Sequence, residues 1–238
     1  MLTPVGADTY FKLPRSVSRA QAGTIPLAAA TAWLALCSKD CLALDRSQAK
    51  GNSVLVWGGS SSVGLYAIQP ASQRGFDVVT TCNPKHADLV LSYGAKHVFD
   101  YKDEKFAEKI KAAAPNLLHA FDTIGNKGSS AAAFQAFFSD PGSICTVRPG
   151  RANTENVVQG TCVTDMLPLC TELILLLQVS KHDHELVAEL FKKVPEWLEK
   201  GYLKPSSPKV LPGLDAVADG FQEYGDGKIS AYKIVYEL

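Results

Sequence analysis

Between residues 54 and 148, short apolar segments alternate with segments of helical character, and only short links separate them. The expected strands cover 54–57, 76–82, 97–100, 118–124 and 143–148. The expected helices lie between them and cover 62–74, 85–94, 103–113 and 127–138. Strands that alternate with helices in this way are typical of an α/β fold whose sheet is parallel. The sequence therefore predicts a doubly wound parallel sheet for this part of the chain.

The segments on either side of this region are less regular. Residues 27–37 are rich in Ala and Leu and favour a helix, with Pro26 in its first turn. After residue 150 the pattern indicates an apolar helix over 165–178 and an amphipathic helix over 184–200. The C-terminal stretch then predicts a short strand, a turn and a helix within 208–228, followed by a last strand over 231–238.

Composition limits the classes of partner. The chain has 238 residues, of which 46% are hydrophobic, so it can form a full core. Lys and Arg together number 24, as do Asp and Glu, and the formal net charge of zero argues against nucleic acid as a main partner. The longest aliphatic run, at 173–177, is far too short for a bilayer span, and residues 1–16 lack a signal-peptide pattern. We therefore expect a cytoplasmic protein with no membrane partner.

The stretch VLVWGGSSSVGLYAIQ, at 54–69, resembles a dinucleotide-binding turn between a strand and a helix. In such a turn the first glycine allows a tight bend, the second lets a pyrophosphate approach, and the third lets the helix pack on the strand. Gly59 and Gly64 fill the outer positions, and Ser61 takes the middle one. We expect the hydroxyls of Ser60, Ser61 and Ser62 to donate to phosphate oxygens, with the helix N-terminus adding free N–H groups.

The end of the second expected strand indicates which dinucleotide would bind. An NAD site usually has Asp or Glu there, about 20 residues past the glycines, to hold the ribose 2′-hydroxyl. This chain has no acidic residue from Val78 to Ala87 and carries TTCNPKH instead. Asn83 can hydrogen-bond, and Lys85 can pair with a 2′-phosphate. This segment favours NADP(H).

Three other motifs suggest different chemistry. Residues 60–64 come close to a hydrolase nucleophile elbow with Ser62 as the nucleophile, and Asp122 followed by His182 or His184 would complete the triad order. The elbow's first glycine is missing, however, which makes a hydrolase the third choice. Tyr101 and Lys105 match the spacing of short-chain dehydrogenases but lie too early in the chain, so we interpret them as a helix start. The KHDH motif at 181–184 is interpreted as an exposed loop rather than a metal site.

The cysteines do not form a metal-binding pattern. None of them forms a CxxC motif or has a histidine at zinc-finger spacing, and packing is the preferred interpretation. They are Cys37, Cys41, Cys82, Cys145, Cys162 and Cys170. We therefore expect no metal.

Five segments together resemble the medium-chain dehydrogenase/reductase superfamily: 24–36, 54–69, 78–101, 121–125 and 227–238. The sequence is most similar to the zinc-less quinone-oxidoreductase-like branch, and within it to fungal trans-acting enoyl reductases that serve polyketide synthases. The resemblance implies a Rossmann-type doubly wound sheet with remnants of a GroES-like catalytic domain at the termini. It assigns 1–23 to that remnant, 24–165 to the NADP-binding domain, and 166–238 to the rest of this domain and the return to the catalytic one.

The resemblance also implies that about a hundred residues, one small domain, would precede this chain in the superfamily. We therefore expect a cleft that is open on one side, with apolar surface exposed at Ile25, Leu27 and Trp33. A second departure concerns Pro70, which lies inside the helix after the glycine turn and should kink it.

The activity implied by the resemblance is metal-free hydride transfer from NADPH to the β-carbon of an α,β-unsaturated thioester or ketone. The substrate would be a small molecule or a carrier-bound enoyl group, and a polyketide synthase would be the partner. The main alternative is a truncated, non-catalytic nucleotide-binding module. No catalytic side chain is assigned.

The site residues that the resemblance implies fall into a cofactor set and a substrate set. The phosphates would lie at Gly59, Ser60, Ser61, Ser62, Val63 and Gly64, and the 2′-phosphate at Asn83, Pro84, Lys85 and His86. Adenine would lie by Tyr101, and the nicotinamide by Val147, Arg148, Pro149, Ile229 and Ser230. The substrate would meet Thr24, Ile25, Pro26, Leu27, Ala28, Ala29, Ala30, Thr31, Met166 and Leu167.

Overall fold

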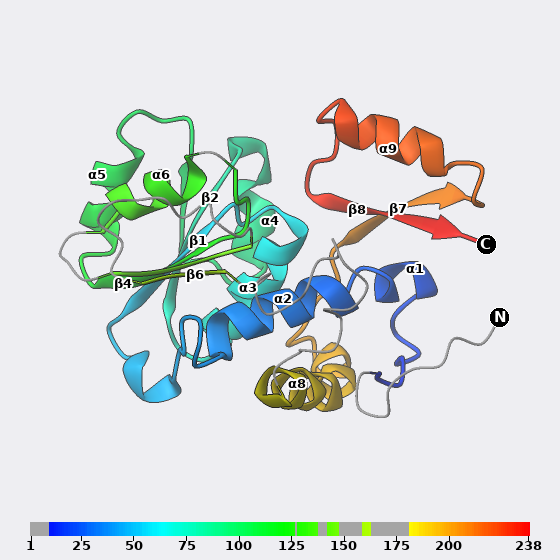
Figure 1. Ribbon diagram of the computed structural model, residues 1–238, viewed down its shortest axis with the longest axis horizontal. Helices are drawn as coiled ribbons and strands as arrows, with labels where there is room; N and C mark the ends of the chain where they lie inside the picture. The colour runs from blue at the N-terminus through cyan, green and yellow to red at the C-terminus, as the bar shows by residue number, and fades with distance from the viewer. Residues whose placement is uncertain (1–9, 127, 138–141, 148–158, 163–180) are drawn as a thin grey trace.

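The computed structural model describes residues 10–126, 128–137, 142–147, 159–162 and 181–238 (Figure 1). Its centre is a six-stranded sheet in the order β3-β2-β1-β4-β5-β6, and every neighbouring pair is parallel. The strands are β1 (Ser53–Trp57), β2 (Asp77–Cys82), β3 (His97–Asp100), β4 (Leu117–Asp122), β5 (Ser143–Thr146) and β6 (Gln159–Cys162). This is the order of a Rossmann sheet, and it confirms the predicted doubly wound fold.

Helices cover both faces of the sheet, because the side chains of β1 alternate between two cores. Val54 and Val56 point into one core, which α2 (Pro26–Cys37), α3 (Ser62–Gln73) and α8 (Lys181–Glu199) also build. Leu55 and Trp57 point into the other core, which α5 (Phe106–Ala113) and α6 (Ser129–Gln135) complete. Figure 1 shows α5 and α6 on one side of the sheet, and α2 and α3 on the other.

Helix α2 is apolar on all sides because most of its length is buried between other helices. It contacts α3 on one side and α8 on the other, and Trp33 and Leu36 are both buried. In the described part of the chain, Arg19–Cys37 is the one stretch long and apolar enough to span a membrane, and 56% of its most apolar window is buried. A core helix passes the same test, and packing between α3 and α8 accounts for the composition of α2.

A smaller unit lies beside the large sheet. Strands β7 (Ser207–Pro212) and β8 (Tyr232–Glu237) pair in parallel, and α9 (Val217–Gly225) connects them. A Cβ added at Gly220 would lie 2.0 Å from the Tyr236 hydroxyl, so glycine lets α9 pack tightly on β8. The short helix α1 (Arg19–Ala22) contacts β7. Figure 1 shows this unit on the right, with α9 on one face of its sheet.

Buried hydrogen bonds from α3 hold the segment that leads into β7. The Gln69 side chain accepts from the Lys204 N–H at 2.7 Å and donates to its carbonyl at 3.2 Å. The Tyr66 hydroxyl accepts from the Ser206 N–H at 3.1 Å and lies 2.9 Å from the Thr24 hydroxyl. These contacts fix the smaller unit relative to the sheet. Helix α3 continues past Pro70 to Gln73.

Several predicted boundaries were wrong for local reasons. The helix expected over 103–113 begins at Phe106, because the Asp103 carboxylate accepts from the Lys105 N–H and forms a turn. The KHDH motif is the first turn of α8 and not a loop, and Asp183 there is buried and accepts from the Ser38 hydroxyl. Strand β6 was missed, and the helix expected over 165–178 lies outside the described residues.

The expected apolar surface is present at only one of three residues. Leu27 is 65% exposed, whereas Ile25 is 0% exposed and Trp33 is 4% exposed. Ile25 belongs to the core cluster that α2 and α3 help to build, and Trp33 lies against the ring of Trp197 with 5.7 Å between centroids. The prediction for Ile25 and Trp33 was therefore wrong, because both side chains are packed in the core.

Candidate functional site

The turn between β1 and α3 depends on glycine at three positions. Gly58 has a φ of +82°, a conformation that other residues rarely adopt. A Cβ at Gly59 would lie 2.0 Å from the Thr80 hydroxyl oxygen, and a Cβ at Gly64 would lie 2.4 Å from the carbonyl oxygen of Gly58. The backbone therefore bends sharply after β1, and α3 starts in direct contact with the turn. This is the geometry that a dinucleotide turn requires.

Ser61 has a structural role in this turn. Its side chain caps α3 by accepting from the Gly64 N–H at 2.9 Å, and it lies 2.8 Å from the Thr123 hydroxyl. Because Thr123 donates its own hydrogen to the Trp57 and Gly58 carbonyls, the hydrogen of Ser61 goes to Thr123. The Ser61 hydroxyl is therefore engaged within the turn, and its contact with a phosphate stays a prediction. Ser60 and Ser62 and the first-turn N–H groups of α3 remain to bind an anion.

The neighbouring strands hold the turn in place. The Gly58 N–H donates to the Thr81 hydroxyl at 3.1 Å, and the Gly59 N–H donates to the Thr81 carbonyl at 2.9 Å. These bonds tie the turn after β1 to the end of β2. The glycine turn is thus fixed from both sides, by Thr81 on β2 and by Thr123 after β4.

Asp122, the last residue of β4, organises the loop that follows. Its carboxylate is fully buried and accepts from the N–H groups of Ile124 and Gly125 at 3.0 and 3.1 Å. It also accepts from the hydroxyls of Ser129 and Ser130 at 2.6 and 2.7 Å. All four donors are local, so Asp122 orients this loop. The hydrolase hypothesis, which paired Asp122 with a histidine, is therefore wrong.

A cavity of about 710 Å³ opens at the carboxyl ends of β1, β2 and β4. This volume falls in the usual range for small-molecule and cofactor sites. No described residue that lines it is Asp or Glu, while Lys85, His86 and Lys228 all do. The described lining residues are Trp57, Gly58, Ser60, Thr81, Cys82, Asn83, Lys85, His86, Tyr101, Ile124, Asn126, Gly128, Ser129, Ala132, Gly227, Lys228, Ile229 and Ser230. We call this space the main cavity.

A second cavity of about 500 Å³ adjoins the main one on the side of β4 and β5. The two share Ser60, Ile124, Gly227, Ile229 and Ser230. The second cavity is further lined by Ser61, Ser62, Thr123, Val147, Tyr224, Ala231 and Tyr232. Together they form one cleft that runs past the glycine turn, with residues 227–231 as its opposite wall.

The segment after β2 presents its side chains to the main cavity. The Asn83 side-chain oxygen accepts from the Lys85 N–H at 3.1 Å and caps the short 3-10 helix η2 (Pro84–His86). Among the described residues, Lys85 makes no ion pair, so its ammonium is available to an anion. Burial, and then the charge of Lys85, lower the pKa of His86 below its usual value.

Most of the predicted cofactor residues lie around this cleft. Ser60, Asn83, Lys85, His86, Tyr101, Ile229 and Ser230 line the main cavity, and Ser62 and Val147 line the second. Gly59, Val63, Gly64 and Pro84 line neither cavity, and the two glycines instead allow the tight turn. Arg148, Pro149, Met166 and Leu167 lie outside the described residues.

The segment predicted to line the substrate site is mostly buried. Thr24, Ile25, Ala28, Ala29 and Thr31 are buried in the packing of α2, and none of them lines either cavity. Pro26 and Leu27 are exposed and Ala30 is half-buried. Within this segment only Pro26, Leu27 and Ala30 could contact a substrate directly, because the other side chains are buried.

Sequence reasoning missed several lining residues. Trp57 is the last residue of β1 and Thr81 the next to last of β2, and Ile124 and Asn126 follow the end of β4. Their place at carboxyl strand ends could have indicated the cleft. Lys228 and Tyr224 gave no such signal. In the described part of the chain, no group of three or more His, Cys, Asp or Glu side chains could hold a metal ion.

Comparison with known proteins finds relatives over most of the chain. A family model described as zinc-binding dehydrogenase matches residues 62–148. A zinc-type alcohol dehydrogenase-like protein of Schizosaccharomyces pombe is 32% identical over 96% of this chain and 69% of its own length. The trans-enoyl reductase ACTTS2 of Alternaria alternata is 30% identical over 97% of this chain and 68% of its own length. The trans-enoyl reductase thnE of Trichoderma harzianum is 31% identical over 98% of this chain and 67% of its own length.

Solved structures share the fold. The CurK enoyl reductase superimposes with a TM-score of 0.70 at 18% identity, over 94% of this chain and 64% of its own. A quinone oxidoreductase of Pseudomonas syringae gives a TM-score of 0.68 at 17% identity, over 95% of this chain and 67% of its own. An NAD-dependent alcohol dehydrogenase gives a TM-score of 0.67 at 20% identity, over 95% of this chain and 61% of its own. The chain thus spans about two thirds of the length of these proteins.

Proposed function

Because this chain belongs to the medium-chain dehydrogenase/reductase superfamily, we propose that it is an NADPH-dependent reductase of enoyl groups. The substrate class is an α,β-unsaturated thioester or ketone, and the context is fungal polyketide biosynthesis in the cytoplasm. The relatives named trans-enoyl reductases support this choice of reaction. The bound nicotinamide would supply the hydride, and no metal takes part.

The observation that carries the proposal is the cleft beside the glycine turn. It lies at the carboxyl ends of β1 and β4, where the strand order reverses and where Rossmann sheets bind their ligands. Its described lining contains Lys85, His86 and Lys228 but no carboxylate. A cleft with this charge favours a ligand with several phosphates.

The described residues fit a dinucleotide. Ser60, Ser62 and the N-terminus of α3 would hold the pyrophosphate, since hydroxyls and free N–H groups meet there. Lys85 would pair with the 2′-phosphate, and Tyr101, which is 44% exposed, would cover the adenine. The second cavity, on the side of Thr123 and Val147, would take the nicotinamide end.

The protein would orient the two reactants and exclude water from them. We assign no proton donor. Ile124 and Ile229 line the cleft on its two sides, and Tyr224 and Tyr232 close the second cavity with aromatic surface. Apolar walls exclude water from a transferred hydride, and fixed neighbours keep the reactants in reacting geometry. The exposed side chains of Pro26 and Leu27 would meet the substrate or the synthase that carries it.

Calorimetry tests the choice of cofactor. Lys85→Ala removes an unpaired cation, and a charge-assisted contact is worth about 1.5–3 kcal/mol, so NADPH should bind at least about tenfold more weakly. NADH affinity should stay the same. The matched control is Lys50→Ala, because Lys50 is exposed near the amino end of β1, at the opposite edge of the sheet. Equal affinity of the wild-type protein for NADPH and NADH would contradict the proposed cofactor.

Turnover is tested separately, by following NADPH oxidation with a crotonyl thioester. Turnover that requires both the thioester and NADPH supports the reductase. Binding of NADPH with no oxidation of it by crotonyl thioesters or enones would instead support the non-catalytic nucleotide-binding module.

A further inference from the structure

A separate cavity of about 420 Å³ lies outside the cleft and is large enough for a small molecule. It shares no described lining residue with the main or the second cavity. Two aromatic and four charged side chains take part in its lining, and we call it the tryptophan pocket. These six residues are Trp33, Trp197, Asp45, Arg46, Arg74 and Lys193.

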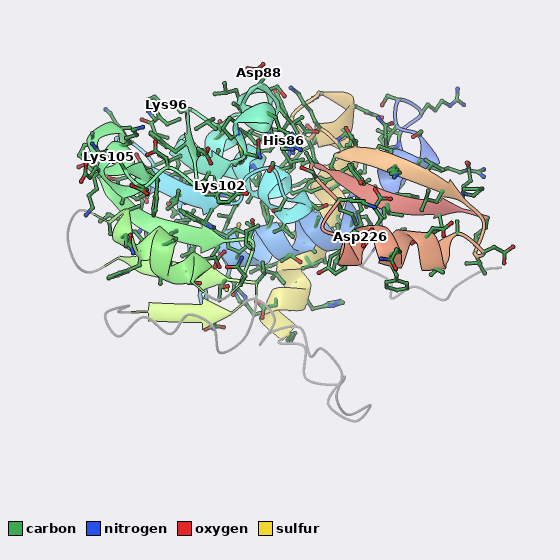
Figure 2. All side chains as sticks on the ribbon, turned by 90° about the horizontal axis from the view of Figure 1, so that it is seen from above. His86, Asp88, Lys96, Lys102, Lys105 and Asp226 are labelled. Atoms are coloured by element: carbon green, nitrogen blue, oxygen red, sulfur yellow. The ribbon has the colours of Figure 1, made fainter. Side chains whose placement is uncertain are left out.

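The tryptophan pocket lies toward the edge of the sheet opposite to the cleft. Arg46, in the short 3-10 helix η1 (Arg46–Gln48), precedes β1, and Arg74 precedes β2, so both lie near the amino ends of these strands. The cleft lies at the carboxyl ends of the same strands. In Figure 2, α8, which carries Lys193 and Trp197, appears on the opposite side of α2 from the labelled His86 of the main cavity. A ligand of this pocket is therefore distinct from a ligand of the cleft.

Two indole rings give the pocket a flat apolar surface. Trp33 comes from α2 and Trp197 from α8, and their ring centroids lie 5.7 Å apart with 58° between the ring planes. The Arg74 guanidinium lies over the Trp33 ring, 4.3 Å from its centroid. Indole rings and a stacked guanidinium are surfaces on which planar apolar groups pack well. The body of a ligand that fits here is therefore planar.

One donor in this lining has no partner. Trp33 is only 4% exposed, and its indole N–H finds no hydrogen-bond acceptor among the described residues. Buried donors are nearly always satisfied in native proteins, because an unpaired one is costly. The N–H lies in the plane of the ring, whereas Arg74 lies over the ring face, so Arg74 does not cover it. An acceptor atom of a bound molecule would satisfy this donor.

Two guanidiniums of the pocket are held by neutral groups and are not neutralised. Arg74 donates from Nη2 to the Cys37 Sγ at 2.8 Å and from Nη1 to the Pro70 carbonyl at 3.4 Å. These bonds use two of its five N–H groups and leave three. Arg46 donates to the Gln73 carbonyl at 3.3 Å. Among the described residues, neither arginine forms an ion pair.

The remaining charges favour a ligand with a single negative charge. Lys193 forms an ion pair with Glu189, so its charge is already compensated. The Asp45 carboxylate accepts from the Ser47 N–H at 2.7 Å and adds one negative charge to the lining. Two unpaired arginines and one aspartate leave an excess of one positive charge. This excess suits a carboxylate, and the aspartate disfavours a phosphate dianion.

We propose that the tryptophan pocket is a second ligand site, which binds a planar organic carboxylate. The body of the ligand lies against Trp33 and Trp197, and its carboxylate accepts from Arg74 and Arg46. The guanidinium fork suits a carboxylate because two parallel N–H groups meet its two oxygens. The Trp33 N–H donates to an acceptor of the same ligand. The inference does not depend on the proposed function, because the pocket lies outside the cleft.

Calorimetric titration of the full chain with 1-naphthoate tests the inference, and 1-naphthamide is the matched probe with the same planar body and no charge. The wild-type protein should bind 1-naphthoate at least about tenfold more tightly than 1-naphthamide. Arg74→Gln should weaken 1-naphthoate about tenfold, and Arg46→Gln, at an exposed position, about threefold. Arg19→Gln is the control and should leave the affinity unchanged, since Arg19 is exposed and lies outside this pocket and the cleft.

The indole N–H signals in an NMR spectrum report the position of the probe. The chain has three tryptophans, and Trp33→Phe and Trp57→Phe identify two of the three signals. Addition of 1-naphthoate should shift the Trp33 signal, because its N–H gains an acceptor or a close neighbour. The Trp57 signal should stay in place, because Trp57 lines the main cavity.

Four results would overturn the inference. The first is a wild-type protein that does not bind 1-naphthoate, which would leave the stacked arginine with a structural role only. The second is equal affinity for 1-naphthoate and 1-naphthamide, a comparison that needs no variant. The third is unchanged 1-naphthoate affinity in both Arg74→Gln and Arg46→Gln. The fourth is a shift of the Trp57 signal without one of Trp33, which would place the probe in the main cavity.

Discussion

Gly64→Ala should separate a dinucleotide turn from an ordinary strand-to-helix turn. A Cβ at this position would lie 2.4 Å from the Gly58 carbonyl oxygen and 2.8 Å from the Gly59 Cα. Both are backbone atoms of the glycine turn, so they cannot move away as a flexible side chain could. The added methyl group must push α3 off the end of β1, and the N-terminus of α3 then moves away from the cleft.

Two opposing effects set the size of the change. Alanine is about 1 kcal/mol better than glycine inside a helix, and Gly64 lies in the first turn of α3. Overpacking costs about 1–3 kcal/mol, and the upper end applies here because the clash is with backbone. The expected net loss in the free energy of unfolding is therefore about 2 kcal/mol. NADPH affinity should fall further than stability alone implies, since the first-turn N–H groups are displaced.

Gly225→Ala is the matched control. Gly225 ends α9, and a Cβ there would meet nothing within 4 Å. Its stability should stay equal or rise by up to about 1 kcal/mol. Urea unfolding with a common slope gives the stabilities, and calorimetry gives the NADPH affinities. If Gly64→Ala is as stable as Gly225→Ala and binds NADPH like the wild type, the contact between α3 and the turn does not matter as described.

Three further predictions follow from buried groups. Tyr66→Phe leaves the Ser206 N–H without its partner and should lower the free energy of unfolding by about 1–3 kcal/mol in urea melts. Asp122→Asn replaces an acceptor of four hydrogen bonds, so urea melts should show a loss of stability, and calorimetry should show weaker NADPH binding. Burial and then the charge of Asp100 raise the pKa of Cys82 to about 11, so this thiol should react slowly at pH 8 until urea unfolds the protein. Rapid reaction of the Cys82 thiol in the folded protein would contradict the last expectation. A Tyr66→Phe or Asp122→Asn variant as stable as the wild type would contradict the other two.

The alternating pattern was enough to predict the sheet, because each strand and helix is a local feature. The same reasoning found the glycine turn and Lys85, since both follow directly from strand ends. The structural bonds of Ser61 could not be predicted, because its partners, Gly64 and Thr123, include a residue 62 positions away. The short β6 was missed because four residues with two polar side chains carry too weak a pattern for a strand.

The far wall of the cleft could not be predicted in the same way. Residues 227–231 belong to the smaller unit, whose entry segment before β7 is held by hydrogen bonds from Tyr66 and Gln69. None of these contacts is encoded by periodicity or by a turn motif. The hydrogen bond between His86 and Ser230 joins this segment to the segment after β2, a contact between residues 144 positions apart.

The polar residues around the glycine turn divide into two groups with different effects on mutation. One group makes hydrogen bonds that hold the turn and its loops: Ser61, Thr81, Asp122 and Thr123. The other faces the cleft, and no described residue pairs with its charge or restricts it to a structural bond: Ser60, Ser62 and Lys85. Since buried hydrogen bonds contribute to both stability and site geometry, changes in the first group should lower both together. Changes in the second should lower cofactor affinity alone, so plotting affinity against stability for the seven alanine variants should give two separate clusters.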